Sequence, residues 1–171
     1  MTASFRLLFG LGLAALLAGC AGYRLGPTNG TPAGSRSVEV ALFPNRTLEP
    51  RLSEPVAQAL RKRFQQDGTF RLATHGDADV LVTGELTQFT RVPLSFQRND
   101  IITTRDYDVQ LTARVKAIER GSGKVLLDRD VVARTTIQNH ADLGSAERQS
   151  APLLAEDLAR KVSSLLVDGA W

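Results

Sequence analysis

Cysteine, histidine and net charge are all scarce in this sequence. Its 171 residues include one cysteine and two histidines, and 21 Lys and Arg side chains stand against 18 Asp and Glu. A single cysteine excludes a disulfide-stapled scaffold. The small cationic surplus falls well short of the basic patch of a nucleic-acid-binding protein, so no nucleic-acid partner is expected. With 43% hydrophobic and 23% charged residues, the composition is that of one globular domain rather than a repeat array or a disordered tail.

An apolar run near the N-terminus is too short to span a membrane. Leu7 to Leu17 follows the single cation Arg6 and is broken only by glycine and alanine. A transmembrane helix needs about 20 apolar residues, whereas a secretory signal needs fewer. We therefore interpret residues 1–19 as a signal peptide.

The lone cysteine follows this run directly. Leu17-Ala18-Gly19-Cys20 resembles the bacterial lipobox, in which the thiol receives diacylglycerol, the chain is cut before the cysteine and the new amine is acylated. The alternative is that Cys20 is only a small apolar residue ending the signal. Several acyl chains, at about 0.8 kcal/mol per buried methylene, anchor a protein stably. Inner-membrane lipoproteins often carry Asp where this chain has Ala21, so the sorting pattern implies the outer membrane and its periplasmic side.

A tether and a strand are predicted to follow. Residues 20–36 are rich in glycine and proline and lack a hydrophobic period, which is typical of a flexible tether. Ser37 to Phe43 alternates, with Val38, Val40 and Leu42 on the side predicted to be buried.

A helix and a short strand come next. Pro55 suits the first turn of the helix, Asp67-Gly68 suits its end, and Phe70 to Ala73 is a short strand. The helical stripe consists of four residues at every fourth position: Leu52, Val56, Leu60 and Phe64.

Two longer strands flank a predicted loop. Asp79 to Thr90 alternates, and Gly84 within it suggests a bulge or a close backbone approach. Arg91 to Thr103 contains Pro93 and several polar residues, which predicts a loop or a frayed hairpin tip. Arg105 to Glu119 has the clearest alternation in the chain, and its inward residues are predicted to be Tyr107, Val109, Leu111, Ala113, Val115 and Ala117.

A hairpin and a final helix complete the pattern. Gly121-Ser122-Gly123 is a three-residue hairpin loop. An even register across it faces Val131 and Ala133 toward Ala113 and Leu111, and it places Asp128 and Asp130 beside Lys116 and Arg114. The final helix has Pro152 in its first turn and the stripe Ala151, Leu154, Leu158, Val162 and Leu165.

The order β-α-β-β-β-β-α, with one weak short strand, predicts the α+β class. Two amphipathic helices are expected on one face of a four-stranded sheet, since this arrangement buries every apolar stripe. Only the first β-α-β connection is long enough for a parallel pair, so the sheet is expected to be largely antiparallel or mixed.

The sequence contains little that indicates a catalytic site or a metal site. The only histidines, His75 and His140, lie in predicted loops, and no G-x-S-x-G elbow is present. The carboxylate pairs Asp77/Asp79 and Asp106/Asp108 could hold a metal, but outward charges on an alternating strand are expected anyway. We expect no catalytic residues, no metal and no cofactor.

Arginines flank and occupy the longest predicted inter-strand loop. Arg91, Arg98 and Arg105 could grip an anionic head group, because the guanidinium fork matches phosphate geometry. The alternative is a solubilising surface.

Several stretches resemble the LptE family of lipopolysaccharide-assembly lipoproteins, and the resemblance covers essentially the whole mature chain. They are the six residues from Cys20, the stretch from Phe43 to Leu52, Ala78 to Leu86 followed by Arg91 to Ser95, the hairpin Gly121 to Val125 and the closing helix around Asp157 to Val162.

The resemblance implies a domain over residues 37–171 with two helices on a four-stranded sheet. It implies a non-enzymatic lipoprotein that plugs the LptD barrel, helps assemble it and takes part in lipopolysaccharide transport. Contact with lipid A phosphates would fall first on Arg98, then on Arg91 and Arg105. Two rival functions remain, a pilotin-like chaperone for another outer-membrane complex and a lipid-anchored periplasmic hydrolase.

Overall fold

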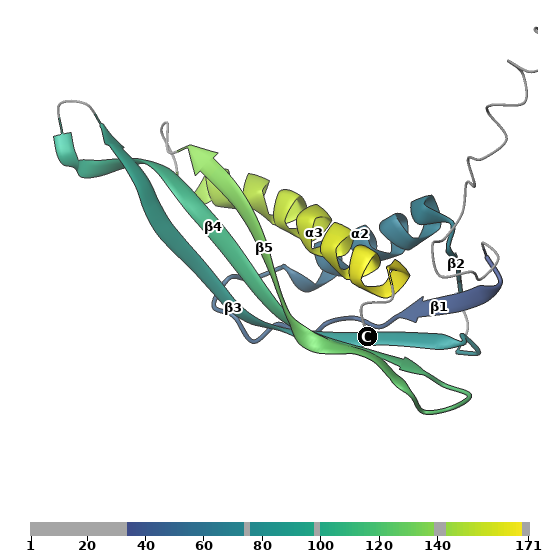
Figure 1. Ribbon diagram of the computed structural model, residues 1–171. Coiled ribbons are helices and arrows are strands. Elements are labelled where there is room, and N and C mark those ends of the chain that lie inside the picture. Colours follow the sequence, from purple (N-terminus) through teal and green to yellow (C-terminus); the bar gives the residue numbers. More distant parts are fainter. Residues whose placement is uncertain (1–33, 74–75, 98–99, 139–142, 169–171) are drawn as a thin grey trace, which may run out of the picture.

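Two helices lie against one face of a five-stranded sheet in the computed structural model, which describes residues 34–73, 76–97, 100–138 and 143–168 (Figure 1). The strand order is β2-β1-β3-β4-β5. The predicted α+β class is confirmed. The predicted count of four strands is wrong, because the weak short strand β2 (Phe70–Leu72) pairs with β1 as a fifth strand at the edge of the sheet.

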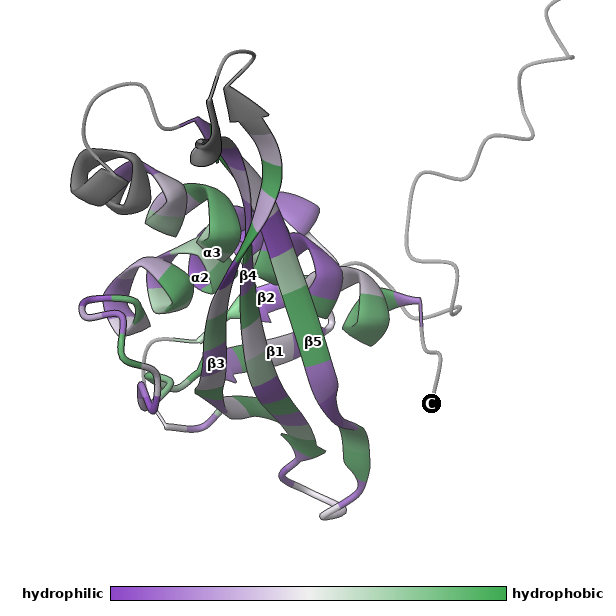
Figure 2. Ribbon diagram, turned by 90° about the vertical axis from the view of Figure 1, so that its left-hand side faces the viewer, coloured by the Kyte–Doolittle hydropathy of each residue, from purple (hydrophilic) through white to green (hydrophobic). Residues whose placement is uncertain are grey.

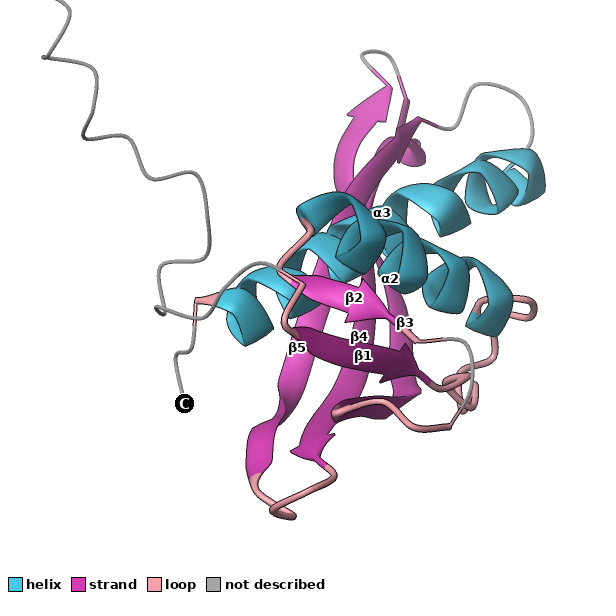
Figure 3. Ribbon diagram, turned by 90° about the vertical axis from the view of Figure 1, so that its right-hand side faces the viewer, coloured by secondary structure: helices cyan, strands magenta, loops and turns pink. Residues whose placement is uncertain are grey.

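The N-terminal half supplies the parallel part of the sheet. Strand β1 (Arg36–Val40) pairs in parallel with both β2 and β3 (Val80–Gln97), and helix α2 (Ser53–Asp67) makes the connection (Figure 3). All four residues of the predicted stripe are buried. The helix ends where the sequence predicts, at Gly68 with φ of 73°, a conformation that glycine adopts without steric cost.

The first strand is shorter than its alternation predicts. It ends at Val40, and Leu42, expected inside, is 51% exposed. Beyond Val40 the chain bends while staying beside β3, since the Ala41 N–H donates to the Val82 carbonyl oxygen and the Leu86 N–H donates to the Pro44 carbonyl oxygen. The bend buries Phe43 instead of Leu42.

The predicted hairpin register is confirmed. Strands β4 (Asp100–Glu119) and β5 (Val125–Gln138) are antiparallel, and Gly123 has φ of 71° in the turn between them. The paired residues are Leu111 with Ala133, Ala113 with Val131, Arg114 with Asp130 and Lys116 with Asp128. Figure 2 shows the apolar and polar residues alternating along these strands, so that one face meets the helices.

The segment 91–103, predicted as a loop or frayed tip, is mostly strand. Strand β3 continues to Gln97, and Pro93 is paired with Tyr107 of β4. Proline fits because β1 pairs with β3 only at Val80–Val82, so further along β3 has a free edge on which a missing N–H costs no ladder bond.

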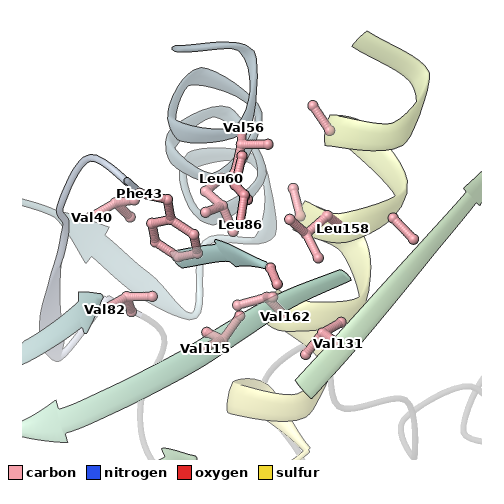
Figure 4. Close-up of a cluster of buried hydrophobic side chains, with 14 of the residues drawn as sticks. Val40, Phe43, Val56, Leu60, Val82, Leu86, Val115, Val131, Leu158 and Val162 are labelled. Atoms are coloured by element: carbon pink, nitrogen blue, oxygen red, sulfur yellow. The ribbon is translucent and has the colours of Figure 1, made fainter. Parts of the chain in front are cut away.

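The last helix begins earlier than predicted. Helix α3 runs from Leu143 to Val167, so Pro152 lies inside it and not in its first turn. An interior proline costs about 3 kcal/mol of helix stability. Burial of the α3 stripe offsets that cost, and Figure 4 shows Leu158 and Val162 within the cluster that joins α3, α2 and the sheet.

Candidate functional site

Strands β3 and β4 extend past the helices (Figure 1), and β5 accompanies β4 as far as Asp106, which is paired with Gln138. We use the name arm for residues 88–97 of β3 and 100–112 of β4. Two of the predicted lipopolysaccharide contacts, Arg91 and Arg105, belong to strands of the arm. They are not opposite each other, since Arg91 is paired with Val109. Arg98 lies outside the described residues, as does Cys20.

A bulge decides which face of the sheet carries Arg91. The pairing of β3 with β4 shifts between Leu86 and Gln88, and this changes which residues of β3 face the helices. Phe89 and Arg91 are paired with the inward residues Leu111 and Val109. Arg91 therefore lies on the helix side of the arm, a placement that simple alternation from Val80 does not predict.

Arg91 contacts Phe89 and Glu49 on that side. Its guanidinium carbon lies 5.7 Å from the centroid of the Phe89 ring, and its Nη2 lies 4.0 Å from Oε2 of Glu49. Glu49 belongs to the loop that precedes α2. The guanidinium is thus held between an aromatic face and a carboxylate.

Hydrogen bonds from its own polar side chains hold the loop that carries Glu49 in shape. Asn45 Nδ2 donates to the Glu49 carbonyl oxygen at 2.7 Å, and Asn45 Oδ1 accepts from both the N–H and the hydroxyl of Thr47 at 3.0 and 2.7 Å. The Arg46 N–H donates to the Leu86 carbonyl oxygen, which fixes the loop to β3. Between this loop and residues 87–91 of β3 lies an open groove of about 540 Å³.

The arm also exposes apolar side chains that the sequence interpretation missed. Val92 is 46% exposed and Leu94 is 56% exposed. Val92 is paired with Asp108, on the face opposite Arg91. The signal was present in the sequence, because Val92 and Leu94 alternate with Arg91 and Pro93 as strand residues do. The arm therefore combines cationic and exposed apolar groups.

The carboxylates of Asp106 and Asp108 have structural partners. Asp106 Oδ2 accepts from the Ser95 hydroxyl across the arm, and Asp108 Oδ2 accepts from the Gln110 amide at 2.6 Å. Over the described ranges no group of three or more metal-ligating side chains is found. His75 and His140 lie outside the described residues. In those same ranges, no helix is both long and apolar enough to cross a membrane.

Asp79, the residue before β3, is hydrogen-bonded to Ser37 of β1 and to Arg120, the residue after β4. Its Oδ2 accepts from the N–H and from the hydroxyl of Ser37, both at 2.7 Å, and its N–H donates to the Ser37 Oγ at 2.9 Å. The Arg120 N–H donates to the Asp79 carbonyl oxygen at 2.8 Å. The Ser37 N–H bond, then the hydroxyl bond, lower the pKa of the Asp79 carboxyl below its ordinary 3.8.

A pH dependence follows from this contact. Because the folded pKa is lowered, the Asp79 carboxylate stabilises the fold above pH 3.8, and this contribution is lost as the pH falls through the folded value. We expect Asp79→Asn to lower the free energy of unfolding at neutral pH and to make it fall less steeply below pH 3.8. Acid titration of unfolding checks this. Ser37→Ala removes the hydroxyl donor but keeps the backbone N–H, so it should flatten the same part of the curve to a smaller degree; a wild-type slope in both variants would assign it to other carboxyls.

Comparisons with known proteins agree with the fold. The sequence model of the LptE family, described as lipopolysaccharide-assembly, matches residues 35–168. No curated protein sequence matches the chain.

Solved structures share the architecture at low identity. A hypothetical protein from Chlamydia trachomatis has a TM-score of 0.57 at 10% identity, covering 79% of this chain and 98% of that one. A Xanthomonas campestris protein has a TM-score of 0.56 at 10% identity, covering 84% and 92%. A minor lipoprotein from Acinetobacter baumannii has a TM-score of 0.51 at 15% identity, covering 77% and 92%. At these identities the likeness concerns the fold alone. The match over residues 35–168 is what shows that the chain belongs to the LptE family of lipopolysaccharide-assembly proteins.

Proposed function

We propose that this chain is a lipoprotein anchored in the outer membrane through Cys20, that it plugs the lumen of an LptD barrel and helps to assemble it, and that it takes part in lipopolysaccharide transport to the cell surface. The family match over residues 35–168 carries the proposal. We assign the chain no catalytic step, because the role of the family is assembly.

The uncovered face of the sheet supports a position inside a barrel. Opposite the helices, Arg114 of β4 lies 2.6 Å from Asp128 and 3.6 Å from Asp130, both on β5. Lys116 of β4 is paired with Asp128 in the ladder, so two cations and two carboxylates lie together on this face. The lumen of a transmembrane barrel is polar, so a face of paired charges fits it without burying an unpaired ion.

Co-purification from native membranes tests the proposed partner. The tagged full chain is expected to bring down a large outer-membrane barrel, whereas an unrelated tagged lipoprotein is not. Recovery of a different outer-membrane assembly would favour a pilotin-like chaperone. Recovery of no barrel, with ester- or peptidoglycan-cleaving activity that depends on a serine or on His140, would favour a hydrolase.

We propose that the arm contacts lipopolysaccharide. The lipid A phosphates would meet Arg98, with Arg91 and Arg105 as further cations, while Val92 and Leu94 would face apolar parts of the same ligand. The assignment is supported by the exposed apolar residues Val92 and Leu94, which follow Arg91 in β3, Val92 on the opposite face of the arm. Arg98 remains first, because the Arg91 guanidinium is already engaged by Glu49.

Charge reversal at Arg98 should weaken lipopolysaccharide binding. A charged hydrogen bond contributes about 1.5–3 kcal/mol, so Arg98→Glu should reduce affinity about tenfold or more. Arg129→Glu is the matched control, since Arg129 is exposed on β5 and outside the arm. Binding is measured against purified lipopolysaccharide, and circular dichroism checks the fold. Equal affinities in the two variants would remove Arg98 from the site.

A further inference from the structure

The free edge of β5 is closed by two side chains of α3. Strand β5 is the last strand of the sheet and runs from Val125 to Gln138, so one of its sides has no strand beside it. Such an edge presents a row of backbone donors and acceptors to which a strand of another chain can pair. On the opposite side of the sheet, the edge strand β2 has only three residues, and β3 has a free edge of its own beyond its pairing with β1.

Two outward backbone groups at the middle of this edge are bonded to α3. Lys161 Nζ donates to the Val132 carbonyl oxygen at 2.7 Å, and the Arg134 N–H donates to Asp157 Oδ2 at 3.0 Å. In an antiparallel ladder, alternate residues of an edge strand turn both backbone groups outward. An incoming strand would need the groups of Val132 and Arg134 that α3 already holds.

Asp157 and Lys161 form an ion pair. They lie one turn apart on α3, and the Lys161 Nζ is 2.7 Å from Asp157 Oδ2. The Asp157 side chain is only 11% exposed, and Arg160 also contacts it. Burial alone would raise the pKa of the Asp157 carboxyl. The hydrogen bonds from Lys161, the Arg134 N–H and Arg160 have the larger combined effect, and they lower the pKa below its ordinary 3.8. A buried carboxylate with this many donors is held in a fixed place.

Packing alone does not shield the edge. Asp130 and Arg134 are exposed, and an open groove of about 420 Å³ lies between β5 and the end of α3, with Val131, Lys161 and Leu165 in its wall. The polar contacts of Asp157 and Lys161 are therefore what closes the middle of the strand.

We propose that Asp157 and Lys161 guard β5 against pairing with the same strand of a second copy of this chain. Antiparallel pairing of two β5 edges about Ala133 would set Val132 opposite Arg134 and Asp130 opposite Thr136. No like charges would lie directly opposite each other in that register, so direct cross-strand repulsion does not oppose self-pairing. The contacts of Asp157 and Lys161 with β5, which we call the guard, therefore oppose self-pairing of this strand.

Oligomeric state tests the guard in the full chain, solubilised in non-ionic detergent. The double variant Asp157→Ala/Lys161→Ala is expected to dimerise at concentrations at least about tenfold lower than wild type, by light scattering after size exclusion. The control Lys62→Ala/Glu156→Ala removes an exposed ion pair that also involves α3 and should behave as wild type. Adding Arg134→Pro to the double variant removes an outward N–H and should restore the monomer.

A second variant, with a smaller change, tests the proposal if the double variant does not fold. Lys161→Ala keeps the Asp157 contact with β5 and frees only the Val132 carbonyl oxygen, so it should remain folded and dimerise to a smaller degree. A guard variant with wild-type circular dichroism that stays monomeric at every concentration tested would overturn the proposal, as would a dimer that Arg134→Pro leaves intact.

Discussion

Replacing Gly84 with alanine is expected to lower the free energy of unfolding by about 3 kcal/mol, the upper part of the range for overpacked cores. A Cβ at this position would lie 2.5 Å from Cε2 of Phe43 and 2.5 Å from the Arg114 carbonyl oxygen. The Phe43 side chain is fully buried, and the Arg114 carbonyl oxygen is part of the backbone of β4. Neither can move away without a cost in free energy. In a domain of this size the melting temperature should fall by about 10 °C.

A matched glycine separates this clash from a general effect of alanine. A Cβ on Gly121 in the hairpin turn meets nothing within 4 Å, so Gly121→Ala should change stability by no more than about 0.5 kcal/mol. Phe43→Leu in the Gly84→Ala background should recover part of the loss, because it removes one of the two collisions. Additive losses in this double-mutant cycle would contradict the predicted contact.

Gly84 also shows how far sequence patterns reach. A glycine inside a strand pattern allows a bulge or a close approach, and both occur here at different places. The close approach is at Gly84 itself, whereas the pairing shifts three residues on, around Thr87. Nothing in the local sequence of Thr87 signals that shift, because it depends on how β3 and β4 pair over their whole length.

The hairpin was predictable because two independent patterns required the same register. Apolar residues had to share the inner face, and opposite charges had to be neighbours on the outer face. Both pairings occur, although Arg114 rather than Lys116 approaches Asp128. The prediction that Leu42 is buried was wrong because alternation does not indicate where a strand ends. The prediction that Pro152 lies in the first turn of the helix was wrong because tertiary burial overrides helix propensity.

The candidate site was predicted only in outline. The arginine spacing indicated one region, and Arg91 and Arg105 do lie on neighbouring strands. The contact between Arg91 and Glu49 joins residues far apart in the chain, which no local motif encodes. The closed edge of β5 is similar, since Asp157 on the helix appears in the sequence as an ordinary surface charge.

Replacing Leu158 with alanine is expected to lower the free energy of unfolding by about 3 kcal/mol, within the usual range for a buried leucine. Leu158 is fully buried, and Figure 4 shows its side chain pointing from α3 into the core cluster. Helix α3 carries an interior proline, so its stability depends on packing more than that of an ordinary helix. Denaturant unfolding of the full chain, followed by circular dichroism, gives the measurement.

Leu153→Ala is the control for that experiment, because it makes the same substitution in the same helix at a side chain that is 51% exposed. Helix propensity changes equally in the two variants, so the difference between them measures burial alone. We expect Leu153→Ala to cost less than about 1 kcal/mol. A loss at Leu158 no larger than the loss at Leu153 would contradict the prediction that docking onto the sheet holds α3 in place, because alanine does not lower helix propensity. A large loss at Leu158 alone would show that the packed face holds an intrinsically poor helix in place, which is the condition that keeps Asp157 and Lys161 against the edge of β5.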